Sequence, residues 1–509
     1  MAEYLMFFLR LLFDFIIYEF GSFESFCLIC LLTIPLIGTF FVYMIPLNYI
    51  RLAKLVALNT AGSIFVVSLI CLNIFDDSEE NIQMKVVFKW LSFFNLNVNF
   101  GIDGISIFFL VLTSLLILLC LLVSWSNTFR VSTYLICFLG LEFLLLCVFS
   151  VLDLLVFYIL FESTLIPMFL VIGVWGSRQR KVRASYFLFL YTVLGSVLML
   201  IAILYIYIQV GSTNYEVLIT FRFSFTEQIF LWIVFFISFA TKIPMVPVHL
   251  WLPEAHVEAP TSGSVILAGI LLKLGTYGFI RFLLPLFPEA SFYFSPLIHT
   301  LALIGIVFAS FTAIRQTDFK RIIAYTSVAH MNLVVLGVFS FNLLGLSGSI
   351  LQSISHGFVA SALFLLIGIV YERHGSRMIK YYGGLVHVMP LYSTVFLFFT
   401  MSNIGLPGTG SFIGEFLILL GFFKYSTVAT VIGATSMVIG GCYSLWLFNR
   451  IVYGNLKTIY IQNFEDLSSK DFFVFLPLIL GTFVLGIFPN LFLAIVKTSV
   501  IILTELLYF

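Results

Sequence analysis

Four ionisable side chains lie inside stretches of this sequence that are otherwise apolar. They are Glu162 in FYILFESTLIPMFL, Lys242 in ISFATKIPMVPVHLWLP, Lys273 in VILAGILLKLGTYGF and Glu415 in GLPGTGSFIGEFLILLG. An ionisable group at bilayer depth costs roughly 2.5–3.5 kcal/mol on insertion scales, so such groups usually face the interior of a helix bundle and mark ion or proton paths. We therefore expect these four residues to transfer protons.

The first two charges form an expected coupling pair. A lysine in a low-dielectric site loses the hydration of its charged form, and a nearby carboxylate restores that form. Moving or neutralising Glu162 would therefore switch Lys242 between holding and releasing a proton. The alternative is a static buried salt bridge, which is a weak stabiliser because desolvation offsets attraction.

Further titratable residues extend this set. Lys273 lies near the middle of its apolar run, which favours a central relay over a side chain that reaches the membrane surface. Glu415 follows a glycine-rich turn and either passes a proton to the outer half-path or caps that turn. His330 and His356 lie between Lys273 and Glu415 in the sequence. They either relay protons or form structural hydrogen bonds. Glu142 is an alternative partner for the site of Glu162, which lies in the predicted helix at 154–175.

A second polar cluster follows the break after Lys242. His249 and His256, together with Glu254 and Glu258, either form a proton-uptake mouth or a solvated polar turn. Asp103, in FGIDGISIFFL, is expected to cap or pack the start of a helix rather than to carry protons. The chain shows no haem, flavin or iron–sulfur ligand pattern, and we predict no metal site and no redox centre of its own.

The composition indicates the environment in which this chain lies. Of its 509 residues, 61% are hydrophobic and 10% are charged, which is typical of a protein in a membrane. A formal net charge of +1 excludes nucleic-acid binding, which needs a strong basic excess. The acidic start of the sequence fits neither a signal peptide nor a transit peptide.

Apolar runs of spanning length, about 20 residues, predict an all-α polytopic membrane protein with fourteen transmembrane helices. The runs fall at residues 27–46, 52–74, 104–123, 131–150, 154–175, 185–208, 229–249, 263–284, 295–314, 322–341, 347–370, 391–421, 428–452 and 472–495. Residues 1–20 are apolar but charged, so they are expected to lie along the interface. Most Lys and Arg residues follow odd-numbered helices, which places both termini on the outer side.

Two of the predicted helices are interrupted. The seventh contains Pro244 and Pro247, and the twelfth contains Gly405, Pro407 and Gly408. Proline removes a backbone donor and glycine permits an unwound turn, and broken helices in corresponding positions of two halves are typical of transporters. Breaks five helices apart predict two inverted five-helix repeats, since five is odd.

The expected domain organisation follows from this repeat. It comprises an interfacial segment with helices 1–3 (1–130), repeat one with helices 4–8 (131–290), repeat two with helices 9–13 (291–452), and a loop with helix 14 (453–509).

Five segments resemble a known family. They are FGIDGISIFFLVLTSLL, FYILFESTLIPMFLVIGVWG, KIPMVPVHLWLPEAHVEAPTSGSVILAGILLKLGTYGFIR, RQTDFKRIIAYTSVAHMNLVVLG and LPGTGSFIGEF. They are similar to the antiporter-like subunits of NADH:ubiquinone oxidoreductase (respiratory complex I), a family related to Mrp-type sodium/proton antiporter subunits. A glutamate in helix 12, at Glu415, favours the subunit 4 type, since subunits 2 and 5 usually carry lysine there.

The resemblance implies one proton path, with Glu162 and Lys242 as the coupling pair, Lys273 as the central lysine and Glu415 as the terminal site. His330 and His356 match the connecting positions. It also implies that NADH, FMN, iron–sulfur clusters and ubiquinone belong to partner subunits, and that subunits 2 and 5 and lipids are neighbours. The implied location is the mitochondrial inner membrane, with both termini in the intermembrane space, or else a bacterial plasma membrane. The alternative function is that of a sodium/proton antiporter subunit.

Overall fold

The computed structural model describes residues 22–91, 96–457, 460 and 465–508. The interfacial segment expected at residues 1–20 lies outside this part. Within the described residues, fourteen helices are long and apolar enough to cross a membrane, which agrees with the predicted all-α polytopic fold.

The first half of the chain consists mainly of helices. In order they are α2 (Phe23–Met44), α3 (Ile50–Ile74), α4 (Ser106–Val123), α5 (Val131–Ser150), α6 (Leu154–Ser163), α7 (Leu165–Trp175), α8 (Lys181–Val210), α9 (Tyr215–Thr220), α10 (Phe225–Lys242) and α11 (Trp251–Glu258). Helices α6 and α7 form one crossing that is interrupted at Thr164. The interruption agrees with Pro167, which lacks the amide hydrogen that would bond the carbonyl of Ser163.

A continuous helix, Thr261–Leu286, lies next and is buried along its length. It is divided into α12 (Thr261–Ile266), η3 (Leu267–Leu271), α13 (Leu272–Gly278), η4 (Phe279–Leu283) and α14 (Leu284–Leu286), where η3 and η4 are π-helical turns. The second half contains α15 (Pro288–Arg315), α16 (Phe319–Val338), α17 (Leu343–His374), α18 (Pro390–Ile404), α19 (Gly410–Phe423), α20 (Thr427–Val452), α21 (Ser469–Ile487) and α22 (Pro489–Tyr508).

Both predicted helix breaks are present. Helix α10 ends at Lys242 and α11 starts at Trp251, while α18 and α19 are separated by residues 405–409. The halves of the second pair have 15 and 14 residues, so neither is long enough to be one of the fourteen spanning helices. The exact limits of the domains and repeats stay predictions.

The last predicted helix, at residues 472–495, is wrong in its bounds. Two helices, α21 and α22, occupy residues 469–508 and meet at Pro489, whose missing amide hydrogen interrupts the helical bonding. They run antiparallel to α17. Asp471 lies 3.8 Å from Arg373 near one end of α17, and Tyr508 donates a hydrogen bond to the carbonyl of Phe341 at the other.

One element was not predicted. An antiparallel hairpin pairs β1 (Gln83–Leu91) with β2 (Leu96–Ile102), between α3 and α4. Its residues are rich in valine and aromatic side chains, which suit strands. The segment is too polar to span a membrane, so a search for apolar runs passes over it.

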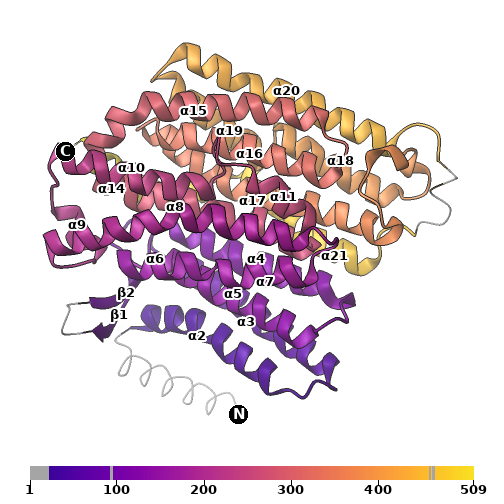
Figure 1. Cartoon of the computed structure of the whole chain (residues 1–509), viewed down its shortest axis with the longest axis horizontal. Coiled ribbons are helices and arrows are strands. Elements are labelled where there is room, and N and C mark those ends of the chain that lie inside the picture. Colours follow the sequence, from indigo (N-terminus) through magenta and orange to yellow (C-terminus); the bar gives the residue numbers. More distant parts are fainter. Residues whose placement is uncertain (1–21, 92–95, 458–459, 461–464, 509) are drawn as a thin grey trace.

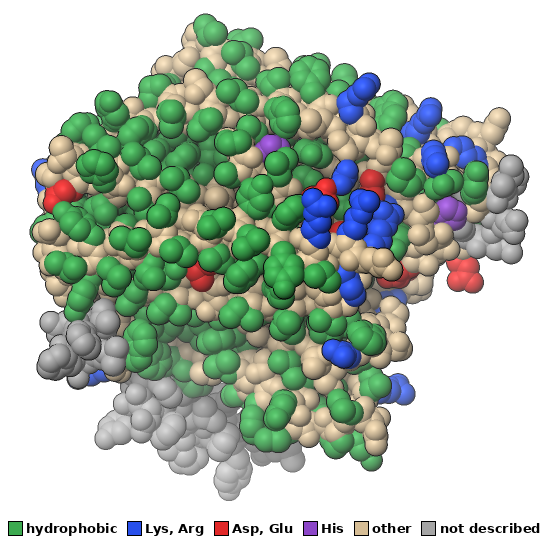
Figure 2. All heavy atoms as spheres, in the orientation of Figure 1, with side chains coloured by type: hydrophobic (Ala, Val, Ile, Leu, Met, Phe, Trp, Pro, Cys, Tyr) green, Lys and Arg blue, Asp and Glu red, His purple; other side chains and the backbone are tan. Residues whose placement is uncertain are grey.

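Figure 1 shows the helices side by side in one bundle, with α2 and α3 at one edge and α15 and α20 at the other. Helices α16, α17 and α19 lie between these edges, together with the buried helix Thr261–Leu286. Figure 2 shows a largely hydrophobic surface on the viewed face, with most of the visible Lys and Arg gathered toward one end. This distribution is typical of a protein whose sides face lipid.

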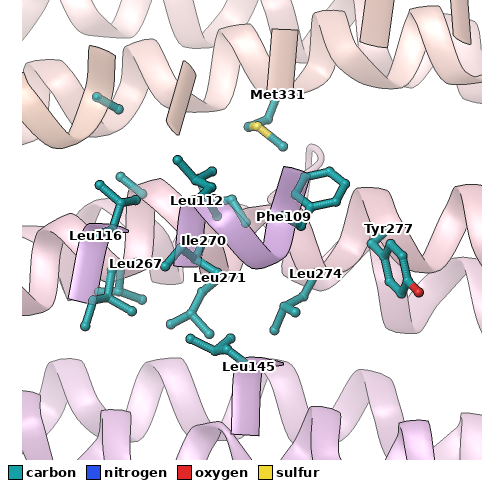
Figure 3. Close-up of a cluster of buried hydrophobic side chains, with 14 of the residues drawn as sticks. Phe109, Leu112, Leu116, Leu145, Leu267, Ile270, Leu271, Leu274, Tyr277 and Met331 are labelled. Atoms are coloured by element: carbon teal, nitrogen blue, oxygen red, sulfur yellow. The ribbon is translucent and has the colours of Figure 1, made fainter. Parts of the chain in front are cut away.

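Apolar side chains fill the space between α4, α5, α16 and the buried helix. Figure 3 shows the cluster, whose labelled members are Phe109, Leu112, Leu116, Leu145, Leu267, Ile270, Leu271, Leu274, Tyr277 and Met331. Lys273 lies on this buried helix, between Leu271 and Leu274 of the cluster.

Candidate functional site

The central lysine is paired with a histidine of another helix. Lys273 is fully buried, and its Nζ lies 2.9 Å from His356 Nδ1 and 2.5 Å from the carbonyl oxygen of Ala268. Lys273 is on α13 and His356 is on α17, so the contact joins the predicted first and second repeats.

Two glycines allow this contact. A Cβ atom on Gly357 would lie 3.1 Å from the carbonyl oxygen of Gly269, and 2.8 Å from Leu112 Cδ2. A Cβ atom on Gly269 would lie 2.7 Å from Ser361 Oγ. The backbones of α17 and η3 therefore approach each other closely only because both positions lack a side chain.

The terminal glutamate is held by the second histidine. His330 Nδ1, on α16, lies 3.0 Å from Glu415 Oε1 on α19. Gln352, on α17, donates a hydrogen bond of 3.1 Å to the same carboxylate oxygen. The Glu415 side chain is 2% exposed, so this carboxylate is stabilised by protein groups rather than by bulk solvent.

The break between α18 and α19 shapes the site of Glu415. Gly405 has a φ of +86°, a left-handed conformation that side chains rarely tolerate. A Cβ atom on Gly405 would also lie 3.2 Å from Glu415 Oε2. The unwound turn therefore faces the carboxylate directly, as expected for a polar site at a helix interruption.

The two histidines complete a row of titratable groups. The ring centroids of His330 and His356 are 5.7 Å apart. Lys273, His356, His330 and Glu415 thus follow one another across α13, α17, α16 and α19, with direct contacts at both ends. We call these four residues the central row. The sequence singled out all four, and the structure brings them together.

The predicted coupling pair is not in contact in this structure. No ion pair within 4.0 Å joins Glu162 and Lys242 in the described chain. Lys242, which is 3% exposed, instead places its Nζ 4.2 Å from the centroid of the Phe161 ring. The indole nitrogen of Trp251 donates to the carbonyl of Thr241, which secures the end of α10 beside the break.

The coupling pair and the central row are separate groups. Gly275, on the same helix as Lys273, packs against Ile243 and the carbonyl of Phe239, next to Lys242. Within the described residues, no hydrogen bond joins Lys242 to the central row. Packed side chains therefore lie between the two lysines.

Glu142 is buried in α5, and neither of its carboxylate oxygens has a hydrogen-bond partner in the described chain. It makes no ion pair with Lys242 there, so its role as an alternative partner stays a prediction. A buried carboxyl group without a partner is costly and needs a functional or structural reason.

The four residues of the polar cluster after the first helix break have different surroundings. Glu254 and Glu258 line a cavity of about 170 Å³, and Glu254 lies 2.5 Å from Arg321. His256 is fully buried and stacks on Phe364, with ring centroids 4.6 Å apart. His249 is turned toward other helices and lies edge-on to Phe308. The four residues therefore do not form one mouth, and only the two glutamates face the cavity.

Two buried basic side chains are not among the residues that the sequence singles out. Lys320 is 2% exposed and donates a hydrogen bond to the carbonyl of Ala259. Arg281 is also buried, and its Nη1 lies 3.0 Å from Asp103 Oδ2. Asp103 additionally accepts a hydrogen bond from the amide of Ser106, as its predicted capping role requires. Lys320 and Arg281 both lie near a helix end, where charges are usually exposed, so the sequence does not show that they are buried.

Comparisons with known proteins agree with this arrangement. The family model described as NADH:quinone oxidoreductase/Mrp antiporter, transmembrane, matches residues 151–440. The NADH-ubiquinone oxidoreductase chain 4 of Arabidopsis thaliana is 54% identical over 471 residues, covering 92% of this chain and 95% of the relative. Chain 4 of Chondrus crispus is 54% identical over 474 residues, covering 93% and 96%.

Solved structures share the fold. A chain of respiratory complex I from Thermus thermophilus superposes with a TM-score of 0.85 at 29% identity, covering 94% of this chain and 99% of that chain. A chain of the Mrp complex from Dietzia sp. has a TM-score of 0.82 at 20% identity, covering 95% and 98%, and this likeness concerns the fold alone. The chain therefore belongs to the NADH:quinone oxidoreductase/Mrp antiporter family of membrane proteins, and within it to the group of NADH-ubiquinone oxidoreductase chain 4.

Proposed function

We propose that this chain is a proton-translocating membrane-arm subunit of NADH:ubiquinone oxidoreductase, driven by redox chemistry in other subunits. The observation that carries the proposal is the central row, in which four titratable side chains cross the interior of the bundle and end beside the break between α18 and α19. Buried ionisable groups arranged in a row are the expected form of a proton relay in a membrane.

The two ends of the central row transfer protons by direct contact. A proton on Lys273 Nζ passes to His356 Nδ1 along the 2.9 Å contact, which leaves a neutral lysine. A proton on His330 Nδ1 passes to Glu415 Oε1 along the 3.0 Å contact, which neutralises the carboxylate. Between the two rings, whose centroids are 5.7 Å apart, transfer requires an intervening hydroxyl group or water molecule.

Glu162 and Lys242 supply the control in this proposal. When the carboxylate contacts the ammonium group, it stabilises the protonated lysine, and when it moves away this stabilisation is lost. A charge change at Lys242 then alters the electrostatic potential at Lys273 through low-dielectric packing, where Coulomb interactions are weakly screened. Proton affinity in the central row thereby follows the state of the coupling pair.

The surroundings of the chain are part of the proposal. We place it in the mitochondrial inner membrane, with both termini on the intermembrane-space side, next to the antiporter-like subunits 2 and 5 and to lipids. NADH, FMN, iron–sulfur clusters and ubiquinone are bound by partner subunits. The names of the relatives support this assembly.

The assembly is tested on native gels of gently solubilised membranes. We expect the chain to migrate in a very large complex together with NADH dehydrogenase activity. Migration in a smaller complex without that activity, combined with sodium-dependent proton exchange in vesicles, would instead establish a sodium/proton antiporter subunit.

A further inference from the structure

The ammonium group of Lys242 lies over an aromatic ring. Its Nζ lies 4.2 Å from the ring centroid of Phe161. The same nitrogen is buried and has no hydrogen-bond partner in the described chain, and no carboxylate there lies within 4.0 Å of it. The face of an aromatic ring attracts a cation, and this attraction is strongest where water is excluded.

The ring is held rigidly in this position. Phe161 is fully buried, with Phe157 at a centroid distance of 5.4 Å and Phe239 at 6.0 Å. The Phe239 ring is nearly perpendicular, at 87°, so it packs edge-to-face with Phe161. The Phe161 ring therefore needs no rearrangement to receive the lysine.

The expected partner of the lysine is the next residue in the chain. Phe161 and Glu162 are consecutive on α6, so they project in directions about 100° apart. Glu162 Oε1 is buried and has no hydrogen-bond partner in the described part. Lys242 has a flexible four-carbon stem, so a change of rotamer can carry its ammonium group from the ring toward the carboxylate.

We propose that Phe161 is a positioning residue that holds the charged side chain of Lys242 while Glu162 is out of contact, so that α6 offers one lysine two alternating sites. The inference rests on the proposed function. It adds the position that the Lys242 side chain occupies while it is not in contact with Glu162. Within the described residues, no ion pair within 4.0 Å joins Lys242 to any other carboxylate.

The test compares aromatic and aliphatic replacements in the intact complex. Phe161→Tyr keeps a ring, whereas Phe161→Leu and Phe161→Met keep an apolar side chain without one. Each complex is reconstituted into vesicles, its assembly is checked on a native gel, and proton uptake per NADH oxidised is followed with an indicator dye across a range of pH.

We expect Phe161→Tyr to pump within about twofold of the unaltered complex. With Leu or Met, the alkaline limb of the pumping profile should move about one pH unit toward acid, which corresponds to about 1.4 kcal/mol of lost interaction with the charged lysine. The inference is overturned if the alkaline limb of the pumping profile is unchanged in both aliphatic variants. It is also overturned if Phe161→Tyr and Phe161→Leu lose equal pumping activity in fully assembled complexes.

Lys242→Met separates this result from the proposed function. If it pumps normally, the function assigned to the coupling pair fails. If it stops pumping while the aliphatic Phe161 variants keep the normal pH profile, only the role of Phe161 fails.

Discussion

Substitution of Gly357 by alanine should slow proton transfer without removing any titratable group. The new Cβ atom would lie 3.1 Å from the carbonyl oxygen of Gly269, where ordinary contacts begin at 3.4 Å. Backbone cannot rotate away as a side chain can, so α17 and η3 must separate by about 0.3 Å or more, with an overpacking cost of roughly 1–3 kcal/mol.

This separation acts on the contact that starts the central row. The distance between Lys273 Nζ and His356 Nδ1 is 2.9 Å, and lengthening it toward the limit of a hydrogen bond weakens the transfer step. A displacement of about 1 Å costs on the order of a hundredfold in rate, so a few tenths of an ångström should cost between about twofold and tenfold. We therefore expect a severalfold slower pumping step.

The assay is proton uptake by reconstituted vesicles, normalised to the amount of assembled complex. Gly140→Ala is the matched control, because Gly140 also lies inside a helix but has open space at its Cβ position. If Gly357→Ala and Gly140→Ala pump equally fast at equal assembly, the close approach of α17 and η3 does not limit transfer, and the reasoning is refuted.

Other substitutions test neighbouring parts of the site. Gly405→Ala should destabilise the break by about 1–2 kcal/mol, because φ is +86°, and should displace Glu415, which a fall in pumping at equal assembly would show. Asp103→Leu leaves Arg281 buried without its carboxylate and should cost roughly 3–5 kcal/mol, measured as a lower thermal midpoint of the complex. The double variant Asp103→Leu with Arg281→Met should recover much of that loss, and equal midpoints for the single and double variants would contradict a dominant ion pair.

The sequence located the titratable residues but not their contacts. Lys273 and Glu415 stand out because each interrupts an apolar run, and a charge in hydrocarbon is rare enough to be informative. That His356 meets Lys273 at 2.9 Å depends on helix packing around Gly357 and Gly269, which no local pattern encodes. Likewise, local sequence does not reveal that Lys242 lies against Phe161 rather than Glu162.

Parts of the fold were beyond prediction for similar physical reasons. Arg281 and Lys320 lie near the ends of apolar runs, where exposed charges are common, yet tertiary packing buries both. The hairpin of β1 and β2 is too short and too polar to register as a span. The break at Pro489 was missed because one apolar run continues across it, so hydropathy alone does not show where the helix ends.

His356→Leu is the decisive test of proton transfer along the central row. This substitution removes the only side chain of the described chain that forms a hydrogen bond with Lys273 Nζ, and it keeps an apolar group of moderate size in α17. In assembled complex, we expect proton uptake per NADH oxidised to fall below that of the unaltered complex and to stay low at every pH. An unchanged ratio at full assembly would contradict proton transfer along the central row.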